Sequence, residues 1–165
     1  HTMSFQKALK SSLRENADIV MIGEMRDLET MQLAITAAET GQLVIATMHT
    51  SGAANSINRI VDSFPFEQQN QVRAQLSESL LAVVWQNLLK TKDNKGRVAA
   101  LEIMFNNNAI ANMIRKQSTH QVDSVIETST KEGMQTMKKA VTDLFHGGLI
   151  TEEAALENIP RQSEI

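Results

Sequence analysis

Residues 18–30 read DIVMIGEMRDLET, and this stretch decides the fold. Its apolar residues Ile19–Ile22 are typical of a strand that is buried on both faces of a parallel sheet. A helical pattern follows from Leu28 to Thr40, and Gly41 is the expected stop. A second apolar strand is expected at Leu43–Thr47. Strand, helix and strand within about 30 residues predict a βαβ unit, in which the two strands run parallel.

Polar side chains follow both expected strands. The first strand leads into Gly23-Glu24-Met25-Arg26-Asp27, and the second leads into Met48-His49-Thr50-Ser51. Parallel strands end at the same edge of a sheet, and open α/β sheets bind ligands outside those ends, so we expect the two segments to converge. Their carboxylates, guanidinium, imidazole and hydroxyl groups suit phosphoryl chemistry in one crevice.

Each of these residues also has a structural interpretation. Asp27 stands directly before the helical pattern, where an acidic residue caps a helix, so the residues leave both a cap and a site role open. A histidine such as His49 is more often structural than catalytic when it stands alone. The presence of Glu24 on the same edge favours the functional interpretation.

The composition limits the class of protein. A chain of 165 residues suits one domain with a core, and a net charge of -3 argues against a general nucleic-acid binder. The chain has no cysteine, and its four histidines lack metal-ligand spacing, so we expect no metal site built from its own side chains. No apolar run reaches the roughly 18 residues of a membrane span.

Helices are expected to dominate after the second strand. A short helix is expected over Ala53–Val61, a long one from Pro65 to about Leu89, and a strand over Val98–Phe105. The other expected helices are Ser4–Glu15, Asn108–Lys116, His120–Glu127, Met134–His146 and Thr151–Asn158. The sequence therefore predicts an α/β fold, with part of a parallel sheet in residues 1–105 and a helical subdomain in residues 106–165.

Two motifs in combination resemble a known family. GEMRD at residues 23–27, followed by LVIATMHTSGA at residues 43–53, resembles the secretion-type motor ATPases of bacteria, and within them the type IV pilus retraction ATPases. The likeness runs through nearly the whole chain, as in RIVDSFPFEQQNQVRAQLSESLLAVVWQNLL and GMQTMKKAVTDLFHGGLI. It implies a RecA-like core, the C-terminal half of a P-loop NTPase domain. GEMRD corresponds to the family's Walker B segment and TMHTSGA to its His box.

The resemblance implies roles for individual residues. Glu24 would be the catalytic carboxylate that orients the attacking water, and His49 would sense the γ-phosphate and couple it to domain motion. Arg26, Asp27 and Thr50 would belong to the nucleotide site or its coupling, although for Arg26 and Asp27 a structural role stays open. Because the family has a glycine where many P-loop proteins have the Walker B aspartate, Mg²⁺ would be held mainly through waters, the nucleotide and the P-loop.

A third segment, AIANMIRK at residues 109–116, resembles the motif tied to retraction in this family. The residues implied in partner contact are Ala109, Ile110, Asn112, Ile114 and Arg115. From the residues alone, Ile110, Met113 and Ile114 lie at helical spacing and favour a core-facing helix instead.

The chain contains no G-x-x-x-x-G-K-[ST] loop to cradle phosphates. The resemblance puts that loop upstream, so the main ligands of ATP and Mg²⁺ would lie outside this chain, and the chain alone is expected not to turn over ATP. The longer protein would be a homohexamer in the cytoplasm, peripheral to the inner membrane at the pilus base, where it meets a platform protein.

Two alternatives stay open. A type II secretion or pilus-assembly ATPase would share Glu24 and His49, but those proteins generally carry a four-cysteine zinc insertion where this chain has KTKDNKGR. A non-enzymatic helical interaction module would need neither residue.

Overall fold

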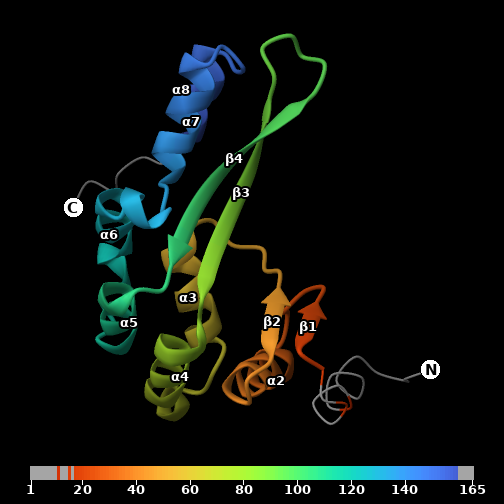
Figure 1. The fold of residues 1–165 in the computed structure, drawn as a ribbon, viewed down its shortest axis with the longest axis vertical. Helices are drawn as coiled ribbons and strands as arrows, with labels where there is room; N and C mark the ends of the chain where they lie inside the picture. The colour runs from red at the N-terminus through yellow and green to blue at the C-terminus, as the bar shows by residue number, and fades with distance from the viewer. Residues whose placement is uncertain (1–10, 12–14, 16, 160–165) are drawn as a thin grey trace. The chain divides into compact units, whose positions relative to one another are not determined.

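The structure is a computed structural model that describes residues 11, 15 and 17–159. Helices and strands are mixed along the chain, as Figure 1 shows, and this confirms the predicted α/β class. Most of the helix expected at Ser4–Glu15 lies outside the described residues. Contacts group the described residues into two compact units. One contains the chain up to Thr50 with Asn55–Leu81 and Asn106–Thr119, and the other contains Ser51–Ala54, Ala82–Phe105 and the chain from His120. The division at residues 105 and 106 into two domains stays a prediction.

The predicted βαβ unit forms the start of the first compact unit. Strands β1 (Ile19–Ile22) and β2 (Leu43–Ala46) pair in parallel along all four residues, and α2 (Leu28–Glu39) connects them. Val20 and Ile22 are buried together with Ala34 of α2. The expectation that β1 is buried on both faces was wrong. The described chain covers only one face of this two-stranded sheet, so Ile19 and Met21 remain exposed.

Helices α3 (Ala53–Asp62), α4 (Phe66–Ser79) and α5 (Asn108–Arg115) follow the sheet, and the first two residues of α3 group with the second unit. Helix α4 packs against both α2 and α5. The side chain of Asn107 accepts hydrogen bonds from the amides of Ala109 and Ile110, which fixes the start of α5.

The long helix expected from Pro65 to about Leu89 was wrong. Helix α4 ends at Ser79, and strand β3 (Ala82–Lys90) pairs antiparallel with β4 (Arg97–Phe105) along nine residue pairs. The long helix was expected because Val72, Leu76, Leu80 and Val84 lie four residues apart. This spacing also fits one face of a strand, whose side chains alternate with a period of two. The β-branched and aromatic run Val83-Val84-Trp85 favours the strand, and the neighbouring hairpin strand stabilises it.

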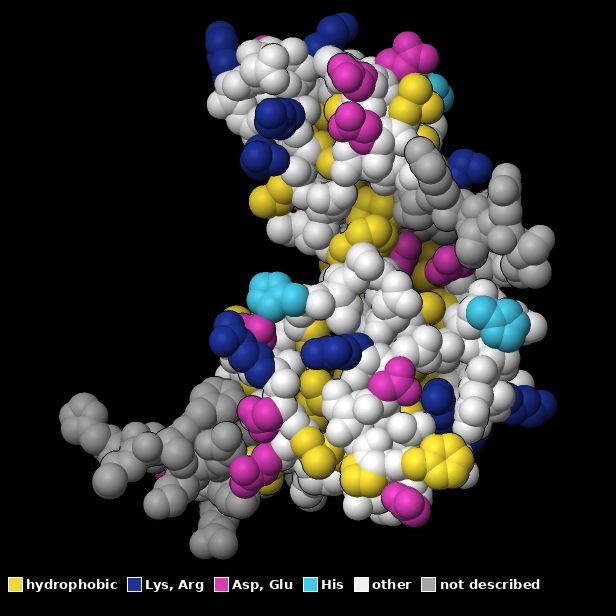
Figure 2. Space-filling view, turned by 180° about the vertical axis from the view of Figure 1, so that it is seen from behind, with side chains coloured by type: hydrophobic (Ala, Val, Ile, Leu, Met, Phe, Trp, Pro, Cys, Tyr) yellow, Lys and Arg dark blue, Asp and Glu magenta, His cyan; other side chains and the backbone are white. Residues whose placement is uncertain are grey.

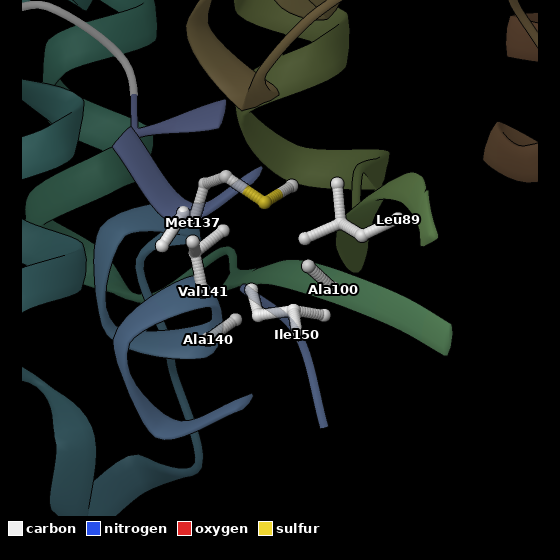
Figure 3. Packing of buried hydrophobic residues seen from close by; sticks show 7 residues of the cluster. Leu89, Ala100, Met137, Ala140, Val141 and Ile150 are labelled. Carbon is white, nitrogen blue, oxygen red and sulfur yellow. The ribbon is translucent and has the colours of Figure 1, made fainter. Parts of the chain in front are cut away.

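The hairpin supplies one side of the core of the second unit. Figure 3 shows Leu89 of β3 and Ala100 of β4 facing Met137, Val141 and Ile150. The helices after β4, besides α5, are η1 (Thr119–Gln121), α6 (Val122–Thr128), η2 (Thr130–Glu132), α7 (Met137–His146) and α8 (Glu152–Asn158). The helix expected from Met134 begins three residues later because Gln135 forms a β-bridge with Ile103.

Charged groups of both signs are interspersed on the molecular face shown in Figure 2, so the described residues form no broad surface of one charge there. Within the part of the chain that the structure describes, no helix is both long enough and apolar enough to cross a bilayer.

Candidate active site

The two polar segments begin where the parallel strands end. After the last paired residues, Ile22 and Ala46, the backbone remains connected through Thr47. Its carbonyl accepts a hydrogen bond from the Met25 amide at 3.0 Å, and its hydroxyl donates to the Gly23 carbonyl. The segments that carry Glu24 and His49 therefore lie side by side beyond the sheet.

Glu24 stands between a guanidinium and an imidazole. Its Oε2 lies 2.6 Å from Nη2 of Arg26, and its Oε1 lies 3.3 Å from Nε2 of His49. The Glu24 side chain is 23% exposed, whereas those of Arg26 and His49 are 74% and 86% exposed. Of the side chains expected to converge, these distances bring only Glu24, Arg26 and His49 together, and their chemical roles stay predictions.

The neighbours of Glu24 change its electrostatics. The hydrogen bond from Arg26 is the largest effect and lowers the pKa of the Glu24 carboxyl. Burial is the next largest and opposes it, and the charges of Arg26 and His49 lower the pKa further. Glu24 in turn raises the pKa of Arg26 through the same hydrogen bond and its charge. At neutral pH the site therefore presents a carboxylate, which accepts hydrogen bonds from water or from a protonated ligand.

Asp27 acts as the N-cap of α2. Its Oδ1 accepts from the amide of Thr30 at 2.9 Å, and both carboxylate oxygens lie within 3.1 Å of the Thr30 hydroxyl. Thr30 is buried, so this contact joins the start of the helix to the core. The cap interpretation of Asp27 is confirmed.

Thr50 contacts helix α3 and not the group formed by Glu24, Arg26 and His49. Its hydroxyl lies 2.7 Å from the hydroxyl of Ser56 in α3. Because Ser56 is buried, this contact fixes the end of the segment that carries His49.

Helix α5, which resembles the retraction motif, has one buried side and one exposed side. Ile110 and Ile114 are fully buried, so they support α5 from inside. Ala109, Asn112 and Arg115 are exposed, although Nη1 of Arg115 also donates to the Ser77 hydroxyl of α4 at 2.9 Å. A partner that binds the exposed side of this helix would therefore contact Ala109, Asn112 and Arg115.

The described residues contain no group of three or more histidine and acidic side chains placed to hold a metal ion. The single carboxylate of Glu24 nevertheless suits Mg²⁺ with a nucleotide, since Mg²⁺ in phosphate sites keeps several waters and needs only one or two carboxylates. The Glu24 carboxylate can accept a hydrogen bond from such a water.

Comparison with known proteins decides the family. The family model described as "Type II/IV secretion system protein" matches residues 1–157. The chain belongs to this secretion family. It is 54% identical to the "Twitching motility protein" of Neisseria gonorrhoeae over 94% of the chain and 41% of that relative. It is 51% identical to the "Type IV pilus retractation ATPase PilT" of Pseudomonas aeruginosa over 94% of the chain and 45% of that relative.

A solved structure agrees with these relatives. A crystal structure of "the Pilus Retraction Motor PilT and Bound ADP" matches with a TM-score of 0.88 and 45% identity, over 99% of the chain and 46% of that protein. This chain thus spans less than half the length of the relatives that it matches.

Sequence reasoning missed two residues of this secretion-family site, Thr47 and Ser56. Thr47 is the first residue after β2 and lies opposite Gly23, so the predicted parallel pairing of the strands could have pointed to it. Ser56 gave no such signal, because its contact with Thr50 depends on how α3 packs.

Proposed function

We propose that this chain is the C-terminal part of a motor ATPase that couples ATP hydrolysis to the retraction of type IV pili. The observation that carries the proposal is the Glu24 carboxylate, held between Arg26 and His49 at the carboxyl ends of two parallel strands. The names of the two relatives, a twitching motility protein and a pilus retraction ATPase, support the same activity.

Glu24 would orient the water that attacks the γ-phosphate. Phosphoryl transfer depends mainly on positioning and on stabilising spread charge, and a carboxylate that is ionised at neutral pH suits the positioning of water. Its two oxygens keep acceptor capacity beside Arg26 and His49, because a carboxylate has about four lone-pair sites. His49 contacts this carboxylate directly. A phosphate that binds the imidazole would therefore change the orientation of the Glu24 carboxylate.

The nucleotide would be ATP with Mg²⁺, which supplies charge neutralisation at the phosphates. The ADP in the related PilT crystal structure supports a nucleotide ligand. Their main ligands, including the P-loop, would come from a part of the protein outside this chain, so the chain alone should not turn over ATP. Multiple turnover by a preparation free of contaminating ATPase would contradict this.

The intact protein would work as a homohexamer in the cytoplasm, peripheral to the inner membrane at the pilus base. Its partners would be identical subunits and a membrane platform protein, with Ala109, Asn112 and Arg115 of α5 as the exposed contact residues. A type II secretion or pilus-assembly ATPase is the alternative. The tight turn at residues 91–96, closed by the Thr91 amide and the Gly96 carbonyl, contains no cysteine and therefore supports the retraction branch.

The substitution Glu24→Gln in the intact protein tests the proposal. It keeps the shape of the side chain and removes its charge, so we expect the steady-state ATPase rate to fall by about two orders of magnitude or more while the nucleotide still binds. Glu67→Gln, an exposed carboxylate on α4, is the control and should leave the rate unchanged. An unchanged rate in Glu24→Gln would mean that Glu24 is a structural residue, and the proposed function would then rest on the likeness to the relatives alone.

A further inference from the structure

We propose that Thr47 is a positioning residue, which sets the direction of the Glu24 carboxylate by holding the backbone on both sides of it. This inference rests on the proposed function, because it assigns Thr47 a role in the same hydrolysis step. The contacts recorded for Thr47 reach the backbone beside Glu24 and none of the side chains of Glu24, Arg26 and His49, so Thr47 would act only through Glu24.

Thr47 forms hydrogen bonds with the residues on both sides of Glu24. The Thr47 hydroxyl donates to the carbonyl of Gly23, the residue before Glu24. The Thr47 carbonyl accepts from the amide of Met25, the residue after Glu24, at 3.0 Å. Two groups of one residue thus hold a three-residue segment whose middle member is the candidate catalytic carboxylate.

The backbone contact continues the pattern of the sheet, whereas the hydroxyl contact is additional. The ladder of β1 and β2 ends at Ile22 and Ala46, so Gly23 lies just beyond it. A methyl group added to Gly23 would meet no atom within 4 Å, so side-chain packing does not restrain this residue. Glycine is also the most flexible residue of the backbone. The hydroxyl of Thr47 therefore supplies a restraint on the Gly23 peptide where packing gives none.

Restraint at this point matters for catalysis. Misplacing a catalytic group by about 1 Å can reduce a rate by about two orders of magnitude. Thr47 is exposed, so its hydroxyl could donate to water without loss, and core stability does not require the contact with Gly23. Two residues later, His49 contacts the Glu24 carboxylate itself, so one short segment controls both the backbone and the side chain of Glu24.

The test compares Thr47→Val with Thr47→Ser in the intact protein. Valine keeps the β-branched shape and removes the hydroxyl, and serine keeps the hydroxyl. We expect kcat to fall by about 10- to 100-fold in Thr47→Val, with nucleotide affinity within about twofold of the unmodified protein, and to stay close to normal in Thr47→Ser. Thr36→Val is the matched control, since the Thr36 hydroxyl also donates to a backbone carbonyl, that of Gln32, away from the site.

A double substitution separates positioning from a general structural effect. If Thr47 acts through Glu24, adding Thr47→Val to Glu24→Gln should lower the residual single-turnover rate by less than about twofold. An equal loss in both backgrounds, an equal loss in Thr47→Ser, or a normal kcat in Thr47→Val would overturn the inference. If Thr47→Val does not fold, as judged by thermal unfolding, Thr47→Ala replaces it with the same expectations.

The same experiments distinguish this inference from the proposed function. Full activity in Glu24→Gln would reject the catalytic role of Glu24, and with it the observation that carries the proposed function. Loss of activity in Glu24→Gln together with full activity in Thr47→Val would reject only the positioning role of Thr47.

Discussion

Glu24 has two partners that are themselves largely exposed to solvent, and this limits what their contacts do for stability. Exposed ion pairs contribute little to stability, because water competes for both charges and the long side chains lose freedom. The pairing of Glu24 with Arg26 and His49 is therefore better explained by the orientation of a carboxylate than by stabilisation of the fold.

The role of Asp27 leads to a clear prediction at the same scale. Asp27→Ala should reduce the free energy of unfolding by about 1 kcal/mol, because the amide of Thr30 loses its acceptor at the start of α2. Asp27→Ser should keep most of the stability, since serine also caps helices. Urea denaturation measures both. A loss of ATPase activity in Asp27→Ser with normal stability would contradict a purely structural role.

The sequence predicts those contacts of the site that follow from strand pairing and helix capping. It does not predict the contacts that depend on how side chains pack. The meeting of Glu24 and His49 follows from parallel strands ending at one edge, and Asp27 follows from helix-capping rules. The Thr47 hydroxyl bond and the contact between Thr50 and Ser56 depend on side-chain directions. Parallel pairing puts Thr47 opposite Gly23, but threonine and serine hydroxyls have many acceptors within reach, so no pattern in the sequence selects the acceptor that each hydroxyl uses.

At the scale of elements, the error over β3 has a physical cause. Apolar residues four apart fit both a helix and a strand, and only the antiparallel pairing with β4 settles which one forms. The βαβ unit was predictable because both of its strands are short apolar runs separated by a capped helix. The apolar run of β1 does not by itself show which face stays exposed, since burial depends on what covers the sheet.

Helix α5 gives a prediction that separates a core role from a contact role. Ile114→Ala should lower the free energy of unfolding by about 2–5 kcal/mol because it leaves a cavity in a fully buried position. Asn112→Ala on the exposed side should change it by less than about 0.5 kcal/mol. Chemical denaturation compares the two. Equal losses in both variants would mean that the exposed side of α5 is also structural.

Asn112→Ala serves a second purpose. If α5 contacts a partner through its exposed side, this variant should impair pilus retraction in cells while the ATPase rate of the purified protein stays normal. Normal retraction in Asn112→Ala would remove this residue from the proposed contact surface.

Glu102 connects elements of the second unit and predicts a pH dependence. Its Oε1 accepts from the Ala53 amide, the first residue of α3, at 2.9 Å, and the Met137 amide at the start of α7 also interacts with this carboxyl. Burial raises the pKa of Glu102 above its ordinary value of 4.5, with Asp123 adding to the rise, while the two amides oppose it. The folded protein therefore binds this proton more tightly than the unfolded chain does.

The sign of the effect follows from that difference. The contribution of Glu102 to the free energy of unfolding should fall as the pH rises from about 4.5 through the raised pKa, because the native state must then ionise a buried group. Glu102→Gln should make the loss of stability between pH 4.5 and 7 smaller. Urea denaturation at pH 4.5 and at pH 7 measures this loss of stability. Glu157→Gln on α8 is the exposed control. The same loss of stability in both variants would contradict this role.

At the scale of the whole molecule, one face of the small parallel sheet remains apolar and exposed. Ile19 and Met21 of β1 are 60% and 74% exposed, and Leu43 and Ile45 of β2 are 42% and 48% exposed. These residues share a face because the strands pair in register, with Met21 opposite Ile45. Contiguous exposed apolar surface is unfavourable in water and promotes association.

We therefore expect the 165-residue chain by itself to associate as its concentration rises. Light scattering should give an average mass that increases with concentration. The double substitution Met21→Lys with Ile45→Lys should bring it back toward the monomer, because two facing charges repel and resist burial. Leu156→Lys, at an equally exposed apolar position on α8, is the control and should leave association unchanged. A constant monomer mass for the unmodified chain would show that this face stays solvated, and that the apolar surface of β1 and β2 does not drive contacts between copies.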